Sequence, residues 1–397
     1  MSKPCGGRTR VTLIGSTPPA RGVSPYVMAL ARALHDRDDV ELDVLSFRSL
    51  YPAFLYPGGH PNTTTDPRVD GGELRVARTL TWWNPLGWVR AGLTLRGDVI
   101  HAQWWSYVLA PAYVTVLTLA RLRGKRVVVT LHNVDPHEGG RLHRIANAAV
   151  LPLANRIIVH SEQNRRVLAG RGVPHDRIDV VPMGSGGAVE PAPERARARE
   201  SLDLPADAPI ALFFGNIRRY KGVDVLLNAF ATVRAALPEA ILVVAGQLWK
   251  DAGDIEDTLR RSGPSVVSRL GYVSAQEMAA VYAAADLVVY PYTRFDAQSA
   301  AACDAIQYAR AIVVSDTGGL PELVDQPEAV VPAGDPAILA RAIVRVLTDA
   351  DLRSRLEAGA MRRSLECSWE TIAGRTVSVY QALRRSSAAM QATGERA

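Results

Sequence analysis

Residues 210–222 read Ile-Ala-Leu-Phe-Phe-Gly-Asn-Ile-Arg-Arg-Tyr-Lys-Gly: five apolar residues, then a loop that begins and ends with glycine. The run Ile210–Phe214 is typical of a buried parallel strand, and the stretch after the loop places Leu226, Phe230 and Val233 on one face of a helix. Strand, loop and helix form the repeating unit of an open α/β sheet. Ligands bind to such sheets beyond the carboxyl ends of the strands, so this loop is the first candidate binding site.

The same alternation of short apolar runs and amphipathic stretches continues on both sides of this segment. It breaks over residues 184–208, where a glycine-rich turn and a Pro/Ala/Arg/Glu stretch predict a hinge. We therefore expect an α/β protein with two Rossmann-like domains, over residues 1–184 and 185–367. The predicted strands are 11–14, 40–44, 99–100, 127–131, 157–159 and 180–181 in the first domain, and 210–214, 241–245, 287–290 and 312–315 in the second.

Composition and charge exclude several classes of protein. The 46 Lys and Arg residues against 40 Asp and Glu leave a net charge of +6 without a long basic block, which argues against a nucleic-acid-binding protein. The three cysteines, Cys5, Cys303 and Cys367, are too few and too far apart for a disulfide framework or a four-cysteine zinc site. Neither a secretory signal nor an apolar run of about 20 residues occurs, so we expect a cytoplasmic protein. Peripheral contact with the inner face of the membrane stays open, and the sequence does not indicate an oligomeric state.

Two familiar nucleotide-binding motifs are missing. The loop after the first strand, Gly15–Gly22, lacks the G-x-G-x-x-G spacing of a dinucleotide site, and no G-x-x-x-x-G-K-[ST] segment occurs. The loop 215–222 instead carries Arg218, Arg219 and Lys221 directly before a helix. Arginines offer forked hydrogen bonds, lysine a point charge and the helix N-terminus its dipole, which together suit a diphosphate. The alternative is an exposed basic turn.

Two carboxylates follow the predicted strand 287–290. Asp296 lies in a loop, and Asp304 lies eight residues later, two turns into a helix. The backbone N–H groups at the start of that helix can bind an anion, and the carboxylates can accept hydrogen bonds from sugar hydroxyls. A capping Asp and a solvated Asp are the alternative. The residues at the start of the helix are Gln298, Ser299 and Ala300.

These segments together resemble the donor domain of glycosyltransferase family 4, whose members are retaining enzymes with the GT-B fold. Residues 213–222 resemble its G-x(5)-K-G loop, and Asp296 and Asp304 fall on its E-x7-E motif. The resemblance implies two Rossmann-like domains that face a cleft, and a C-terminal helix over 368–390 that crosses back to pack on the N-terminal domain. Further segments that resemble the family are 178–184, 312–322 and 368–369.

The resemblance also implies roles for the donor-side residues. Arg218 and Lys221 bind the donor diphosphate, Asp304 holds the ribose, and Asp296 faces the donor sugar. Both acids are one methylene shorter than the family's glutamates, so the donor contacts are closer or run through water. The remaining donor-side residues are Gly215, Gln298, Ser299 and Ala300.

The first domain is then the acceptor side. His132, at the end of the predicted strand 127–131, resembles the family's strand-end histidine, so we expect it beside the acceptor hydroxyl or the transferring sugar. His132, His137 and Glu138 could imitate a metal cluster, but the resemblance implies a reaction without metal or cofactor. Five tryptophans within Trp82–Trp105 form either a core or an aromatic acceptor surface. The predicted acceptor-side residues are Gly22, His101, His132, Asn133, His137, Trp104 and Trp105.

The implied reaction moves a hexose-type sugar from a UDP- or GDP-linked donor to an acceptor hydroxyl, with retention of configuration and without metal. Surface glycans, lipid-linked acceptors and secondary metabolites stay open as acceptors, and the Ala/Arg-rich composition indicates a bacterial source. The alternatives are coupling to a non-sugar or sugar-phosphate acceptor, and a catalytically silent nucleotide-sugar-binding protein. The residues assigned to catalysis are His132, Arg218, Lys221 and Asp296.

Overall fold

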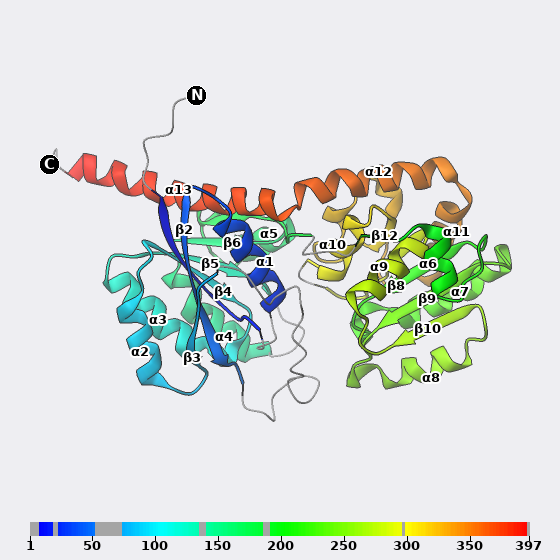
Figure 1. Ribbon diagram of the computed structural model, residues 1–397, viewed down its shortest axis with the longest axis horizontal. Helices are drawn as coiled ribbons and strands as arrows, with labels where there is room; N and C mark the ends of the chain where they lie inside the picture. Colours follow the sequence, from blue (N-terminus) through cyan, green and yellow to red (C-terminus); the bar gives the residue numbers. More distant parts are fainter. Residues whose placement is uncertain are drawn as a thin grey trace. The chain divides into compact units, whose positions relative to one another are not determined.

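Seven parallel strands form one sheet and six form another, each in a compact unit of its own in the computed structural model (Figure 1). The structure describes residues 8–18, 23–51, 74–134, 140–185, 191–295 and 298–394. The first unit comprises Met1–Gly187 together with Trp369–Ala397, and the second comprises Ala188–Ser368. The chain therefore leaves the first unit once and returns to it for its last helix.

The first sheet has the strand order β3-β2-β1-β4-β5-β6-β7, which reverses direction beside β1. Apart from the edge strand β3, its strands contain buried runs of β-branched and aliphatic residues, as the apolar pattern predicts. The carboxyl ends of β1 and β4 flank the point of reversal, where open sheets bind their ligands. The strands are β1 (Thr9–Gly15), β2 (Val40–Ser49), β3 (Val76–Thr81), β4 (Val99–Trp104), β5 (Arg126–Leu131), β6 (Arg156–Val159) and β7 (Ile178–Val180).

Two helical layers cover this sheet, because successive side chains of a strand point to opposite faces. Val127 and Val129 belong to a core shared with α2, α3, α4 and α5, whereas Val128 belongs to a core shared with α1 and α13. Tyr380 of α13 lies in that second core and is completely buried. The helices are α1 (Ser24–His35), α2 (Pro85–Thr94), α3 (Ala110–Leu122), α4 (Gly140–Val150), α5 (Glu162–Gly170) and α13 (Trp369–Gly394).

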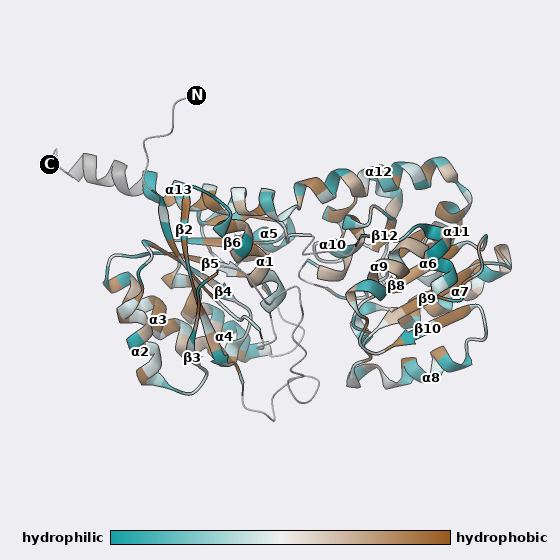
Figure 2. Cartoon of the chain, viewed as in Figure 1, coloured by the Kyte–Doolittle hydropathy of each residue, from teal (hydrophilic) through white to brown (hydrophobic). Residues whose placement is uncertain are grey.

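The second sheet has the order β10-β9-β8-β11-β12-β13 and reverses between β8 and β11. Its strands are β8 (Ile210–Phe214), β9 (Ile241–Gly246), β10 (Val266–Leu270), β11 (Leu287–Tyr290), β12 (Ala311–Ser315) and β13 (Val330–Val331). The helices around them are α6 (Arg195–Ser201), α7 (Val223–Ala236), α8 (Gly253–Arg261), α9 (Ala275–Ala284), α10 (Ala300–Gln307), α11 (Pro336–Thr348) and α12 (Ala350–Glu366). Many of the helices carry alternating hydrophobic and hydrophilic bands (Figure 2).

Each of the ten predicted strands overlaps an observed one, and three observed strands, β3, β10 and β13, were not predicted. All three are edge strands, each paired with a single neighbour. Edge strands bury few side chains, and β3 and β10 contain exposed polar residues that interrupt the apolar pattern. None of the helices in the described ranges is long and apolar enough to cross a membrane.

A buried ion pair joins the start of the second unit to its sheet. The Arg199 guanidinium donates to Asp286 Oδ2 at 2.9 Å and also to the backbone oxygens of Ala284 and Ala206. Asp286 in turn accepts a hydrogen bond from the backbone N–H of Ile210, the first residue of β8, at 2.8 Å. The pair therefore fixes α6 against the beginnings of β8 and β11.

Replacing Arg199 by Ala is expected to lower the free energy of unfolding of the second unit by about 2–3 kcal/mol, because a buried charge-assisted hydrogen bond is lost and Asp286 keeps only the partly exposed Arg195 as its cation. Urea unfolding followed by circular dichroism measures the change. Arg260→Ala is the matched control: Arg260 pairs with Glu256 on the exposed face of α8, and its loss should cost at most about 0.5 kcal/mol. Equal effects of the two substitutions would contradict the structural role of Arg199.

Candidate functional site

The loop after β8 is built on two glycines with positive φ angles. Gly215 has a φ of 130° and Gly222, in the left-handed conformation, has a φ of 67°. A Cβ at Gly222 would lie 2.0 Å from the carbonyl oxygen of Pro291, so the loop contacts the end of β11 through its backbone. Because Gly222 is also the N-cap of α7, the loop and the helix start are fixed together.

Lys221 is the buried cation of this loop. Its side chain is 8% exposed, and its Nζ lies 5.2 Å from the centre of the Tyr292 ring. Among the described residues it makes no hydrogen bond or ion pair. Burial lowers the pKa of the Lys221 ammonium, Tyr220 partly opposes that shift, and Arg218 adds to it. An ammonium in this position is stabilised by an anion, which the described residues do not supply.

The two arginines of the loop differ in their surroundings. Arg218 lies between aromatic rings, with its guanidinium carbon 4.7 Å from the centre of the Trp249 ring and 5.5 Å from that of Tyr220, and it pairs with Asp251 at 3.4 Å. Arg219 is exposed and pairs with Asp254 at 2.9 Å. Of the three cations singled out from the sequence, Lys221 and Arg218 are thus held against the body of the unit and Arg219 is on its surface.

The start of α10 lies beside Gly215. A Cβ at Gly215 would be 3.1 Å from Ala301 Cβ and 3.4 Å from Lys221 Nζ, so three predicted features meet at one point. Ser299 caps α10 by accepting a hydrogen bond from the N–H of Ala302, and its hydroxyl lies 2.9 Å from that of Tyr292. The N–H groups of the first turn of a helix have no carbonyl partner within it and favour anions.

The remaining donor-side predictions have different outcomes. Gln298 is buried beside Ser299, and Ala300 is the first residue of α10. Asp304 is half-buried on the same helix, near the hydroxyls of Tyr282 and Tyr290. Asp296 lies outside the described residues. The structure thus brings residues 215–222, which we call the lysine loop, together with the start of α10, because they follow β8 and β11, which are neighbours in the sheet.

Two aromatic residues of the site were missed in the sequence. Tyr292 contacts Lys221 and Ser299, and its ring packs edge-on against Tyr220 at 5.9 Å between centres. Trp249 follows β9 and packs on Arg218. Both residues lie just beyond the carboxyl end of a strand, which is the signal that could have identified them.

In the first unit, His132 follows β5 and takes part in a buried network of hydrogen bonds. Its Nδ1 lies 3.2 Å from Nε2 of His160, and its Nε2 lies 2.9 Å from the side-chain amide of Gln103. His160 Nδ1 donates to the carbonyl oxygen of Val181 at 3.0 Å. Both ring nitrogens of His132 therefore have partners inside the unit, and its ring is fixed in one orientation.

The network continues to the C-terminal helix. The Gln103 amide also lies 3.1 Å from His101 Nε2, and His101 Nδ1 lies 2.6 Å from the hydroxyl of Tyr380 on α13. Burial lowers the pKa of His101 to about 3 and that of His160 to about 4. Burial also lowers the pKa of His132 well below its usual value, so all three imidazoles are neutral at pH 7.

The other acceptor-side predictions lie mostly in the interior. Trp104 is completely buried and donates to the Asn147 side chain at 2.6 Å, and Trp105 is buried and donates to the Tyr51 hydroxyl at 2.9 Å. His101 is also completely buried, and Asn133, beyond β5, is half-buried. Trp104 and Trp105 thus belong to the core under α3 and α4. The remaining two predictions, Gly22 and His137, lie outside the described residues.

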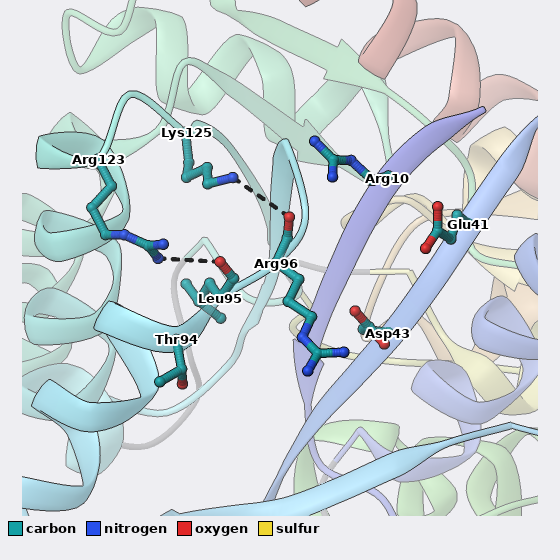
Figure 3. A pocket seen from close by; sticks show the side chains of 8 residues that line it. All are labelled: Arg10, Glu41, Asp43, Thr94, Leu95, Arg96, Arg123 and Lys125. Carbon is teal, nitrogen blue, oxygen red and sulfur yellow. Dashed lines mark hydrogen bonds between the residues drawn. The ribbon is translucent and has the colours of Figure 1, made fainter. Parts of the chain in front are cut away.

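A pocket of about 340 Å³ in the first unit lies away from these residues (Figure 3). It is at the amino-terminal ends of β1, β2 and β4, the edge of the sheet opposite to the ligand-binding edge. Two of its cations, Arg10 and Lys125, pair with Asp98 at 3.0 and 3.6 Å. The lining residues are Arg10, Glu41, Asp43, Thr94, Leu95, Arg96, Arg123 and Lys125.

Comparison with known families gives matches over both halves of the chain. Residues 20–184 match the family model described as Glycosyltransferase Family 4. Residues 208–349 match the model described as Glycosyl transferases group 1. The second match includes the lysine loop and α10, and the first includes the histidine network up to Val181.

Similar proteins are known over nearly the whole length. The D-inositol 3-phosphate glycosyltransferase of Thermobispora bispora is 28% identical over 92% of this chain and 91% of that protein, and that of Salinispora arenicola is 26% identical over 91% and 87%. Sucrose-phosphate synthase from Thermosynechococcus elongatus superposes with a TM-score of 0.72 over 96% of this chain and 100% of that chain, at 22% identity. HepE of Anabaena, solved in complex with UDP, superposes with a TM-score of 0.72 over 94% of this chain and 100% of that chain, at 17% identity. These structures confirm the predicted fold class, two Rossmann-like units of the GT-B type.

The buried histidines predict acid destabilisation of the first unit. Unfolded histidines take up protons near pH 6.5, whereas His101 and His160 in the folded unit resist protonation down to about pH 3 and about pH 4. The free energy of unfolding should therefore fall as the pH falls from about 6.5 to about 4. Thermal unfolding midpoints across this range should decline less steeply for His160→Gln than for the original protein. The exposed His175→Gln is the control, and a slope for His160→Gln equal to that of the control would refute the prediction.

Proposed function

The chain belongs to the family 4 glycosyltransferases, and we propose that it transfers a hexose-type sugar from a UDP- or GDP-linked donor to a hydroxyl group of its acceptor. The observation that carries the choice of donor is Lys221, a buried ammonium without a hydrogen bond or ion pair to the described residues. A diphosphate beside Gly215 would supply the missing anion. The first turn of α10, next to Gly215, would donate backbone N–H groups to the same diphosphate.

Charge stabilisation is the main demand of this reaction. The bond between the anomeric carbon and the diphosphate oxygen breaks, so negative charge accumulates on the leaving diphosphate. Lys221 lies where it can compensate that charge, and Arg218, held between Trp249 and Tyr220, adds a second cation. Cations fixed in a water-poor site stabilise a developing charge without reorganising, which is usually the largest contribution to catalysis.

We propose that configuration is retained and that no metal takes part. The acceptor oxygen forms its bond to the anomeric carbon on the face that the diphosphate leaves, and the acceptor proton passes to a phosphate oxygen of the donor. The two cations take the role that a metal ion plays in other transferases. Asp304, half-buried on α10, is the proposed partner of the ribose hydroxyls, and Asp296 that of the donor sugar.

His132 has a positioning role in this proposal. Both of its ring nitrogens have partners inside the first unit, and the ring is neutral. It therefore orients the loop after β5, with Asn133, toward the acceptor rather than accepting the proton itself. The name of the similar bacterial enzymes, D-inositol 3-phosphate glycosyltransferase, favours a phosphorylated polyol as a second candidate for the acceptor.

Replacing Lys221 by Ala is expected to weaken the binding of UDP or GDP by about 10- to 100-fold, because a charge-assisted contact to phosphate is lost. Isothermal titration calorimetry measures the affinity. Arg219→Ala is the matched control on the same loop: Arg219 is exposed and paired with Asp254, so the affinity should change by less than about threefold. Unchanged affinity in Lys221→Ala would overturn the assignment of the loop.

Sugar transfer, or slow hydrolysis of the donor in the absence of acceptor, is expected to continue at an undiminished rate in EDTA, because Lys221 and Arg218 supply the charge. Proton NMR of the first product should show the anomeric configuration of the donor. A rate that collapses in EDTA and recovers with Mg²⁺ or Mn²⁺ would contradict the metal-independent reaction. A product of inverted configuration would contradict retention but would not contradict the assignment of the donor site.

A further inference from the structure

One helical layer of the first unit exposes an unusual number of large apolar side chains. In the described part of this unit, every exposed large hydrophobic residue lies on α2, α3 or α4, or directly before α2. The helix α3 packs against α2 on one side and α4 on the other, so the three form a continuous layer. We call these residues the apolar face: Trp83, Leu86, Val89, Leu93, Leu122, Leu142 and Ile145.

The helix α2 presents a regular apolar stripe to solvent. Leu86, Val89 and Leu93 follow a spacing of three and four residues, which places them on one side of the helix. They are 81%, 40% and 51% exposed. Trp88, on the opposite side, is buried and donates to the backbone oxygen of Thr81 at 2.6 Å. The helix therefore has apolar residues that pack on the core and a second set that the described part of the chain leaves exposed.

The helix α4 buries two polar residues and exposes its two largest apolar ones. His143 and Asn147 are buried, and Asn147 accepts a hydrogen bond from Trp104. Leu142 and Ile145, the larger apolar residues, are 58% and 65% exposed. A surface helix ordinarily buries its apolar side and exposes its polar side. The folding of this unit alone does not explain why α4 exposes Leu142 and Ile145.

The charged side chains on the three helices themselves are all positive. None of the three helices contains an Asp or a Glu. Asp98, the one acid among described residues 82–160, is paired with Arg10 and Lys125. The exposed cations on the three helices are Arg90, Arg121, Arg141 and Arg144, and Arg96 and Arg123, which follow α2 and α3, line the pocket that also contains Glu41 and Asp43.

We propose that the apolar face is a docking surface for a lipid bilayer that contains anionic lipids. Tryptophan and leucine side chains enter the boundary between headgroups and acyl chains, and the arginines lie at the level of the lipid phosphates. The helices, of 10 to 13 residues, are too short to span a bilayer and lie in its plane. This inference is independent of the proposed sugar transfer.

Charge favours a membrane over a second copy of the chain. A symmetric dimer through this face would bring two sets of arginines together, and the three helices carry no acids to pair them, so like charges across the interface would oppose association. An anionic bilayer offers the opposite charge. The second unit lacks this combination in its described residues: Met361 and Leu365 are exposed on α12, but that helix carries both acids and arginines.

Cosedimentation with vesicles tests the proposal. The full chain is expected to bind vesicles with about 30% phosphatidylglycerol at least about tenfold more tightly than vesicles of phosphatidylcholine alone. Binding should weaken when NaCl is raised from about 50 mM to about 500 mM. The double variants L86E/L93E and L142E/I145E should each lose binding by about tenfold or more, since carboxylates would replace apolar anchors.

The variant M361E/L365E is the matched control, with the same chemical change on α12, and should bind as the original protein does. Thermal unfolding midpoints verify that the variants are folded. Failure of the original protein to bind anionic vesicles, or undiminished binding by both face variants, would overturn the proposal. A concentration-dependent dimer in light scattering that L86E/L93E dissolves, without vesicle binding, would also overturn it and assign the face to a second copy.

Discussion

The candidate donor site depends on backbone segments that approach one another more closely than a side chain would permit. A Cβ at Gly246 would lie 2.0 Å from the carbonyl oxygen of Gly215, and one at Gly222 would lie 2.0 Å from that of Pro291. These contacts join the ends of β8, β9 and β11. Because Lys221 and the first turn of α10 both adjoin Gly215, their proximity follows from the absence of side chains at these positions.

The buried histidines of the first unit and the buried lysine of the second differ in whether the protein itself provides their partners. In the first, His101, His132 and His160 are neutral and satisfied by one another, by Gln103 and by the backbone, so nothing further is needed to stabilise them. In the second, Lys221 is buried without a described partner, which is costly in the absence of a ligand. A group that is stable only with a ligand indicates a binding site more strongly than a satisfied network does.

The sequence predicted the fold well because buried parallel strands are continuous apolar runs, as in Ile210–Phe214. It also identified the lysine loop and the start of α10 as candidate binding segments, but did not show that they meet, because an apolar run does not show which strands are neighbours in the sheet. It could not show that Arg219 pairs with Asp254, because a loop arginine can bind either a ligand or a neighbouring acid. It also could not show that Trp104 is interior, because tryptophans occur both in cores and on binding surfaces. The exposure of Leu142 and Ile145 on α4 was also unpredictable, since a spacing pattern identifies apolar residues without showing whether the fold buries them.

The helix α13 begins at Trp369, after the whole second unit, yet its residues complete the core around α1 in the first. During synthesis, the first unit therefore emerges early and waits for some 180 residues of another unit before its last helix arrives. Until then Leu30 and Leu34 lack the neighbours that α13 supplies. The unit whose synthesis begins first therefore completes its folding last. A chain that is truncated before α13 would leave the core around α1 uncovered.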